Sequence, residues 1–445
     1  MVTVRTPLRL PAGGRDRIWH PWTPVRQAQR LTLVSGHGCQ VKDDQGRVYL
    51  DFRSGTLNAA VGYGHPAVVG AMREQAARLM TWDLAEVSTL PARALADRIA
   101  GLLPEPLEYT LFCNGGSEAT EAAVKIARMW HRLQGRPGRT VVMSFADGYH
   151  GATAAAIAAT ASPFRRDGAG PLPGGYAHLA TPRCGACAAG EDHGGCTVPG
   201  ADEWEAQILS VGPESVAAVL IEPVLSVGGI IVPPPGELAA LRDLCDRHGI
   251  LLIADEVATG FGRTGRMFGF EHDLGADGRV PDIITTAKGL TGGYAPLAAV
   301  TVRADIHHVF ARDSLLGGLR HGHTTGGHAT ACAAALTVLD IVEDEKLVPA
   351  AAARGAQLLR ALAPLKERPA VRDVRGLGLL IGVEMASVEL AALVARAAQE
   401  QGVLIRGFGP VLTVAPPLII GEQEAGHGAR VLSRAIRSVT EGGTR

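Results

Sequence analysis

Two apolar segments near the middle of the chain each end in a charged residue, and this pair most constrains the fold. ILLIADE ends in Asp255 and Glu256, and PDIITTAK ends in Lys288. Short aliphatic and β-branched runs of this kind are typical of strands buried on both faces of a parallel sheet. Because parallel α/β sheets carry their sites at the carboxyl ends of the strands, we expect Asp255 and Lys288 to lie close together.

The same strand pattern recurs through residues 63–325, where helical stretches separate the strands. The strand-like segments include YTLFCNG, TVVMSF, VAAVLIEP and APLAAVTV, and SEATEAAVKIARMWHRL favours a helix between the first two. This alternation predicts an α/β fold in which helices cover both faces of a mainly parallel sheet. We assign residues 63–325 to a large domain of this kind.

The two ends of the chain predict a smaller α+β domain, and 445 residues are too many for one simple core. Residues 1–62 contain an extended arm and a hairpin, CQVKDDQGRVYLDF. Residues 326–445 begin with an alanine-rich linking helix and continue with the strand-like segments RGLGLLIGVEM, VLIRGF and VLTVAPPL. We therefore place residues 1–62 and 326–445 in the small domain.

Charge and hydropathy exclude two classes of partner. The formal net charge is −1, so the chain lacks the basic surface that holds nucleic acid. Its apolar runs are shorter than the roughly 20 residues that cross a bilayer, which predicts no membrane association. The amino end, MVTVRTPLRLPAGGRDR, has no apolar signal core, and we expect a cytoplasmic protein.

The seven cysteines do not form a disulfide scaffold in a chain of this length. Four potential metal ligands fall close together in PRCGACAAGEDHGGC, namely Cys184, Cys187, His193 and Cys196. Their spacing is compatible with a zinc site. We predict a surface loop without metal, and the zinc alternative stays open.

The types of residue at the predicted strand ends indicate a specific chemistry. An apolar surrounding disfavours the Lys288 ammonium and favours a neutral, nucleophilic amine. Together with a carboxylate on another strand end, such a lysine can hold an aldehyde cofactor as an imine. In CNGGSEATEAA, Gly115 and Gly116 allow close approach of a phosphate to the backbone, and Ser117 is expected to cap the following helix.

The motifs from IWHPWTP near the amino end to GPVLTVAPPL near the carboxyl end resemble the class III aminotransferases among the fold-type-I pyridoxal-phosphate enzymes. The resemblance covers nearly the whole chain and is strongest to the ω-amine:pyruvate and diaminopelargonate-type enzymes. It implies a fold-type-I α/β architecture, pyridoxal 5′-phosphate (PLP) as cofactor, and a homodimer with shared active sites.

The resemblance also assigns roles to residues of this chain. Asp255 would bond the pyridine nitrogen and keep it protonated. Tyr149 and Val257 would cover the two faces of the ring. Lys288 would form the resting imine and then carry a proton between the substrate Cα and the cofactor C4′. Glu222 would belong to the polar network beside the cofactor.

The cofactor phosphate would lie at Gly115, Gly116 and Ser117, as in the phosphate cup of the family. A further contact would come from Thr324 in RHGHTTGGHATACAAAL, which in the family reaches across the dimer interface. If this holds, the active site is complete only in the dimer.

Departures from other subfamilies narrow the substrate. Ornithine and 4-aminobutyrate enzymes pair a glutamate with an arginine at positions that Val227 and Thr413 occupy here. Arg406 matches instead the arginine of the ω-amine:pyruvate and diaminopelargonate-type enzymes, and a guanidinium suits bidentate binding of a carboxylate. Trp22 is a candidate wall of the substrate pocket. Ala152 stands where diaminopelargonate enzymes carry aspartate, which disfavours that activity.

We therefore predict an ω-aminotransferase that moves an amino group from a primary amine or ω-amino acid to a small 2-oxo acid by a ping-pong mechanism. Another PLP reaction on the same fold, such as aminomutase, racemase or decarboxylase chemistry, is the first alternative. A non-catalytic PLP-binding protein is the second. A third alternative, a nicotinamide-dependent oxidoreductase, is suggested only by the glycines of RGLGLLIG. These glycines precede a strand, whereas those of a dinucleotide-binding motif open a helix.

Overall fold

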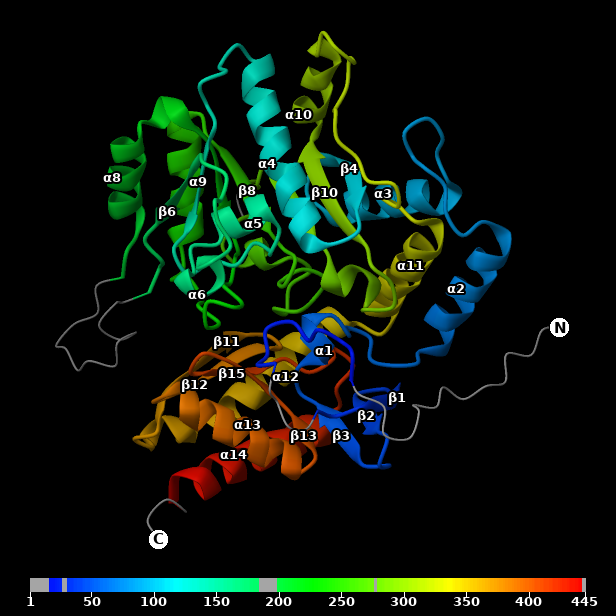
Figure 1. Cartoon of the computed structure of the whole chain (residues 1–445), viewed down its shortest axis with the longest axis vertical. Helices are drawn as coiled ribbons and strands as arrows, with labels where there is room; N and C mark the ends of the chain where they lie inside the picture. The colour runs from blue at the N-terminus through cyan, green and yellow to red at the C-terminus, as the bar shows by residue number, and fades with distance from the viewer. Residues whose placement is uncertain (1–15, 26–29, 184–197, 276–277, 442–445) are drawn as a thin grey trace.

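The computed structural model describes residues 16–25, 30–183, 198–275 and 278–441. These residues form a larger part built around a seven-stranded sheet and a smaller part that contains both ends of the described chain (Figure 1). None of the helices in the described segments combines the length and the apolar composition that a bilayer crossing requires.

The large sheet has the strand order β4-β10-β9-β8-β7-β5-β6. In this order, the strands are Leu107–Cys113, Ala298–Arg303, Ile283–Thr286, Leu251–Asp255, Val216–Ile221, Val141–Phe145 and Tyr176–Leu179. Only β10 runs antiparallel to its neighbours, so the prediction of a mainly parallel sheet is confirmed.

Both faces of this sheet are buried, because successive strand residues belong to different cores. Leu220 and Ile253 pack with helix α4 (Gly116–Leu133) on one face. Val219 and Leu252 pack with helices on the opposite face. Those helices are α3 (Leu90–Leu102), α8 (Ala201–Val211), α9 (Glu237–His248) and α11 (Ala329–Asp344). The central strands β7, β8 and β9 are therefore buried throughout and rich in aliphatic and β-branched residues, and this property made them recognisable in the sequence.

Helix α2 (Pro66–Arg78) and four short helices complete the larger part. The short helices are α1 (Ser54–Leu57), α5 (Ala154–Ala159), α6 (Pro163–Arg166) and α10 (Ala304–Val309). Helix α2 packs on α11, and α6 lies at the edge of the larger part that faces the smaller one (Figure 1).

The smaller part joins segments from the two ends of the chain. Strands β1 (Leu33–His37), β2 (Gln40–Asp43) and β3 (Val48–Asp51) form an antiparallel unit, which contains the predicted hairpin, and β3 pairs in parallel with β13 (Val403–Leu404). A second sheet has the order β11-β12-β15-β14. Its strands are Val371–Leu377, Leu380–Met385, Val411–Val414 and Arg406–Phe408.

Three helices cover these sheets and share one apolar core with them. They are α12 (Leu347–Leu362), α13 (Val388–Glu400) and α14 (Glu422–Glu441). The pairing of β3 with β13 brings segments from the two ends of the chain together, while α11 packs on the large sheet, and the predicted domain boundaries stay a prediction.

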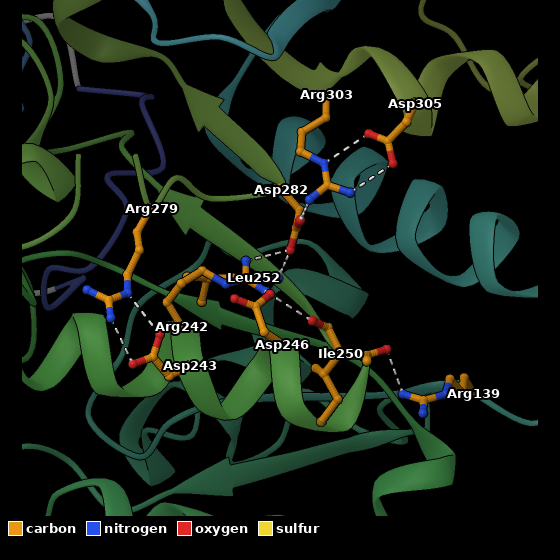
Figure 2. Close-up of polar contacts among 11 residues, drawn as sticks. Arg139, Arg242, Asp243, Asp246, Ile250, Leu252, Arg279, Asp282, Arg303 and Asp305 are labelled. Carbon is orange, nitrogen blue, oxygen red and sulfur yellow. Dashed lines mark hydrogen bonds and ion pairs between the residues drawn. The ribbon is translucent and has the colours of Figure 1, made fainter. Parts of the chain in front are cut away.

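A buried ionic network holds the amino ends of the central strands (Figure 2). Asp282, directly before β9, accepts hydrogen bonds from Arg242 at 2.7 Å, from Arg303 at 2.6 Å and from the backbone N–H of Leu252 at 2.6 Å. Asp282 is thereby satisfied by donors from α9, β10 and β8, as a buried carboxylate requires. The network fixes the strand ends that lie opposite Asp255 and Lys288.

Candidate active site

A cavity of about 470 Å³ opens at the carboxyl ends of the central parallel strands. Asp255 ends β8 and lies beside Thr285 of β9, three residues before Lys288. Glu222 follows β7 directly, and Tyr149 lies beyond the end of β5. The cavity lining contains eight residues that the sequence singled out, namely Gly115, Gly116, Ser117, Tyr149, Glu222, Asp255, Val257 and Lys288.

Lys288 has an uncommon backbone conformation. Its φ is +39°, in the left-handed region that a non-glycine residue adopts only at a cost, and it opens a short 3₁₀ turn from Lys288 to Thr291. Burial lowers the pKa of its amine, although the carboxylates of Glu222 and Asp255 oppose this shift. A larger share of the amine is therefore neutral than in a solvated lysine.

Asp255 is held by two donors from residues that also line the cavity. The backbone N–H of Val257 donates to its Oδ1 at 3.1 Å, and Nδ1 of His150 lies 2.8 Å from its Oδ2. A carboxylate only accepts hydrogen bonds, so Nδ1 of His150 carries the proton. Sequence analysis missed His150, although it directly follows Tyr149 in the YHG motif.

Glu222 ties two loops to the cavity wall. Its Oε1 accepts from the backbone N–H of Tyr149 at 2.9 Å, and its Oε2 accepts from the backbone N–H and the hydroxyl of Ser226 at 2.9 and 2.6 Å. Burial raises the pKa of the Glu222 carboxyl. Its position is consistent with the polar network predicted for it.

The amino end of α4 forms the floor of the cavity. Gly115 precedes the helix with an extended backbone, and the first N–H groups of any helix lack partners inside it. The prediction that Ser117 caps α4 is wrong, because the helix already begins at Gly116 and the Ser117 hydroxyl accepts from the N–H of Ala152 at 3.0 Å. Glu118 instead accepts from the N–H of Asn114 at 2.7 Å.

Two glycines at this floor have steric reasons to be glycine. A Cβ on Gly116 would lie 3.0 Å from a methyl group of Val257. Gly151 has φ +129°, and a Cβ there would lie 2.4 Å from the Ser117 hydroxyl oxygen. This side of the cavity is therefore lined by small residues and backbone N–H groups. The Ser117 hydroxyl, which accepts from Ala152, still has its own proton to donate.

These residues fit PLP. The amino end of α4 suits the phosphate, Asp255 suits a protonated ring nitrogen, and Lys288 presents an amine to the aldehyde. Tyr149 and Val257 both line the space that a flat ring would fill. The cavity thus has a complementary group for each functional part of the cofactor.

Three predicted site residues do not line this cavity. Trp22 is 48% exposed and its ring lies 5.6 Å from the guanidinium of Arg165. Arg406 in β14 has its guanidinium 4.3 Å from the ring of Phe408. Thr324 is exposed. The four residues of the possible zinc loop, Cys184, Cys187, His193 and Cys196, lie outside the described residues.

Comparison with known proteins decides the family. The family model for class-III aminotransferases matches residues 23–436. The chain belongs to the class-III aminotransferases. It is therefore a PLP-dependent enzyme of fold type I.

Individual relatives span nearly the whole chain. An adenosylmethionine-8-amino-7-oxononanoate aminotransferase of Nitratidesulfovibrio vulgaris is 36% identical over 98% of this chain and 83% of its own length. An (S)-enantioselective omega-transaminase from Thermomicrobium roseum is 37% identical, with a TM-score of 0.88 over 95% of this chain and 96% of its own. An amine transaminase from an uncultivated Pseudomonas species, in PLP-bound form, is 35% identical with a TM-score of 0.90 over 96% and 99%.

Proposed function

We propose that this aminotransferase acts on ω-amines: it moves an amino group from a primary amine or ω-amino acid to a small 2-oxo acid in a ping-pong cycle. The observation that carries this proposal is the position of Arg406. Its guanidinium lies over the ring of Phe408 and has no carboxylate partner within ion-pair distance among the residues the structure describes, and Arg406 lies opposite Thr413 in the pairing of β14 with β15. A free guanidinium at this place can receive the carboxylate of the oxo acid.

The side chains around the cavity have distinct tasks in the transfer. PLP, when bound, supplies an electron sink for the bond that breaks at the substrate Cα. Asp255, held by His150, keeps a proton on the ring nitrogen. Lys288 takes the proton from the substrate Cα, and its lowered pKa favours the neutral amine that this task requires. Tyr149 and Val257 hold the ring between them and exclude water.

The relatives support this substrate class without deciding it. The Thermomicrobium roseum enzyme is named an omega-transaminase, whereas the Nitratidesulfovibrio vulgaris enzyme is named for a different amino acceptor. Ala152 lies beside Ser117, at the position where we expect an aspartate in diaminopelargonate-type enzymes. We therefore prefer the ω-amine reading.

A donor panel tests the proposal. The purified PLP enzyme is incubated with primary amines or ω-amino acids and with pyruvate or 2-oxoglutarate, and both products are quantified. We expect one carbonyl product for each aminated acceptor and parallel double-reciprocal plots. The variant Lys288→Ala should lose at least about a thousandfold in turnover. A carbonyl product formed without an aminated acceptor would indicate another PLP reaction, and failure of every donor would reject the proposed ω-amine substrate class.

We also infer a homodimer that shares its active sites, and a cytoplasmic location. Large apolar side chains that are exposed on the single chain support the dimer. They include Trp82, Leu90 and Leu315, and Leu90 is 81% exposed. Such apolar exposure indicates a protein–protein contact when it is gathered on one face.

A further inference from the structure

A second arginine stands beside the active site with the features of an anion receptor. Arg165 lies on the short helix α6, and its guanidinium is 5.2 Å from the ring centre of Tyr149, a residue that lines the cavity. On other sides it meets the rings of Trp22 at 5.6 Å and Phe164 at 5.8 Å. Sequence analysis did not single out this residue.

The contacts of Arg165 leave most of its donors available. Aromatic rings interact with a guanidinium through its faces, whereas its N–H groups point outward in the plane. One of its terminal nitrogens donates to the Ser162 hydroxyl at 3.1 Å. Within the described part of the chain, Arg165 forms no ion pair with a carboxylate. The charge of the buried Glu222 acts on Arg165 but makes no ion pair with it, so this half-buried arginine, held by aromatic rings, can still bind an anion that comes from outside.

Arg165 belongs to a positive cluster near Tyr149, on which the charges of both Arg165 and Arg406 act. Burial lowers the pKa of Arg406, and the neighbouring charges of Arg53 and Arg165 lower it further. Nε of Arg53 donates a hydrogen bond to the carbonyl oxygen of Gly55 at 2.6 Å. Each of the three arginines keeps guanidinium N–H groups that could bind an anion, and Arg165 is the one whose guanidinium contacts the ring of Tyr149 in the cavity lining. Their mutual repulsion is relieved when anionic groups bind between or beside them.

We infer that Arg165 binds the carboxylate of an ω-amino acid donor, while Arg406 serves the carboxylate of the oxo acid. The inference rests on the proposed ω-aminotransferase function. The amine of such a donor must reach Lys288, and its carboxylate lies at the far end of the chain. Arg165 beside Tyr149 offers this carboxylate a rigid, bidentate partner, so the enzyme should prefer donors with a distal carboxylate over uncharged amines.

The test compares charged and uncharged donors of equal length. Conversion of the bound PLP to its amine form is followed in single turnovers, without an oxo acid. The donors are 4-aminobutyrate and 6-aminohexanoate, each against the n-alkylamine of the same carbon number. The measured quantity is the ratio of the second-order rate constants, charged over uncharged. We expect this ratio to fall at least tenfold in Arg165→Met, which keeps a long apolar side chain against the rings, and to recover partly in Arg165→Lys.

The matched variant Arg406→Met separates the two arginines. In the reverse half-reaction with pyruvate, Arg406→Met should lose more rate than Arg165→Met. An unchanged charged-to-uncharged ratio in Arg165→Met would overturn the inference, and so would an equal loss for both donors, which indicates only a packing role. A ratio that falls in Arg406→Met alone would assign the donor carboxylate to Arg406. In all three cases turnover by the parent enzyme still supports the proposed ω-aminotransferase function. That proposal is rejected only if no donor reacts.

Discussion

His150 holds the carboxylate of Asp255 in position by a hydrogen bond. Its Nδ1 donates to Asp255 at 2.8 Å, and both side chains are buried. Without this donor, Asp255 would keep only the backbone N–H of Val257 and would be less firmly aimed at the ring nitrogen. His150 is therefore a positioning residue, which acts on the cofactor through Asp255.

Two amide variants test this role, because they differ in where they place a donor. His150→Asn puts a side-chain N–H near the position of Nδ1, whereas His150→Gln puts it near Nε2. A hydrogen bond to a charged group contributes about 1.5–3 kcal/mol, so we expect about a tenfold or greater weakening of PLP binding in His150→Gln. His150→Asn should bind PLP nearly as the parent does. Titration of apoenzyme with PLP, followed by visible absorbance, measures both, and equal affinities would contradict the role.

The residues that sequence analysis located are those whose position follows from local pattern. Asp255 and Lys288 end adjacent parallel strands, so the sheet itself brings them together. His150 and Arg165 were missed because their partners depend on distant packing. The contact of His150 with Asp255 spans 105 residues of chain, and that of Arg165 with Trp22 depends on the course of the amino-terminal arm.

The same reasoning explains which elements were predictable. Strands β7, β8 and β9 are buried along their full length, and their residues are aliphatic or β-branched apart from Asp255 at the end of β8. Strand β6 is only four residues long and buries Leu179 alone, so its sequence YAHL gives no strand signal. The cap of α4 was misassigned by two positions, since Gly115 and Ser117 are both acceptable caps in the sequence.

One helix-to-strand contact should make stability depend on pH. His131, near the end of α4, is buried and its Nε2 lies 2.8 Å from the carbonyl oxygen of Ala217 in β7. Burial lowers the pKa of His131 from 6.5 to about 4. The folded chain therefore keeps the imidazole neutral, while the unfolded chain binds a proton below pH 6.5. Stability from this group is present above pH 6.5 and is lost as the pH falls toward 4.

Between pH 7 and pH 5 this group should remove about 2 kcal/mol from the free energy of unfolding. Urea unfolding at both pH values measures the loss. His131→Leu should be less stable at pH 7, because Ala217 loses its donor, but its stability should fall less on acidification. His37→Gln is the control, since His37 is exposed in β1. An identical pH dependence in the parent and His131→Leu would contradict the assignment.

At the scale of the whole molecule, the proposed sharing of active sites between subunits can be tested at the segment around Thr324. Thr325 donates from its hydroxyl to the side-chain oxygen of Asn114 at 2.7 Å, which places the segment beside the amino end of α4. Thr324 itself is exposed and does not line the cavity of its own chain. This arrangement fits a threonine that completes the phosphate site of a second copy.

Mixed dimers test this arrangement directly. One copy carries Lys288→Ala, and the other carries Thr324→Glu, whose carboxylate would repel a phosphate. Each variant alone should be nearly inactive and should sediment at about twice the chain mass of 46.4 kDa. If the sites are shared, one of the two sites in the hybrid combines an intact Lys288 with an intact Thr324. Coexpressed, doubly tagged hybrids should then regain up to about half of the parent activity.

The hybrid outcome is decisive because the two models predict opposite results. If Thr324 served the cavity of its own chain, each site of the hybrid would carry one of the two defects, and the hybrid would stay inactive. Thr324→Ser keeps the hydroxyl and serves as the control that the segment tolerates substitution. Inactive hybrids together with an active Thr324→Ser enzyme would therefore exclude a shared phosphate site, while leaving the cavity around Lys288 and Asp255 as the place of the reaction.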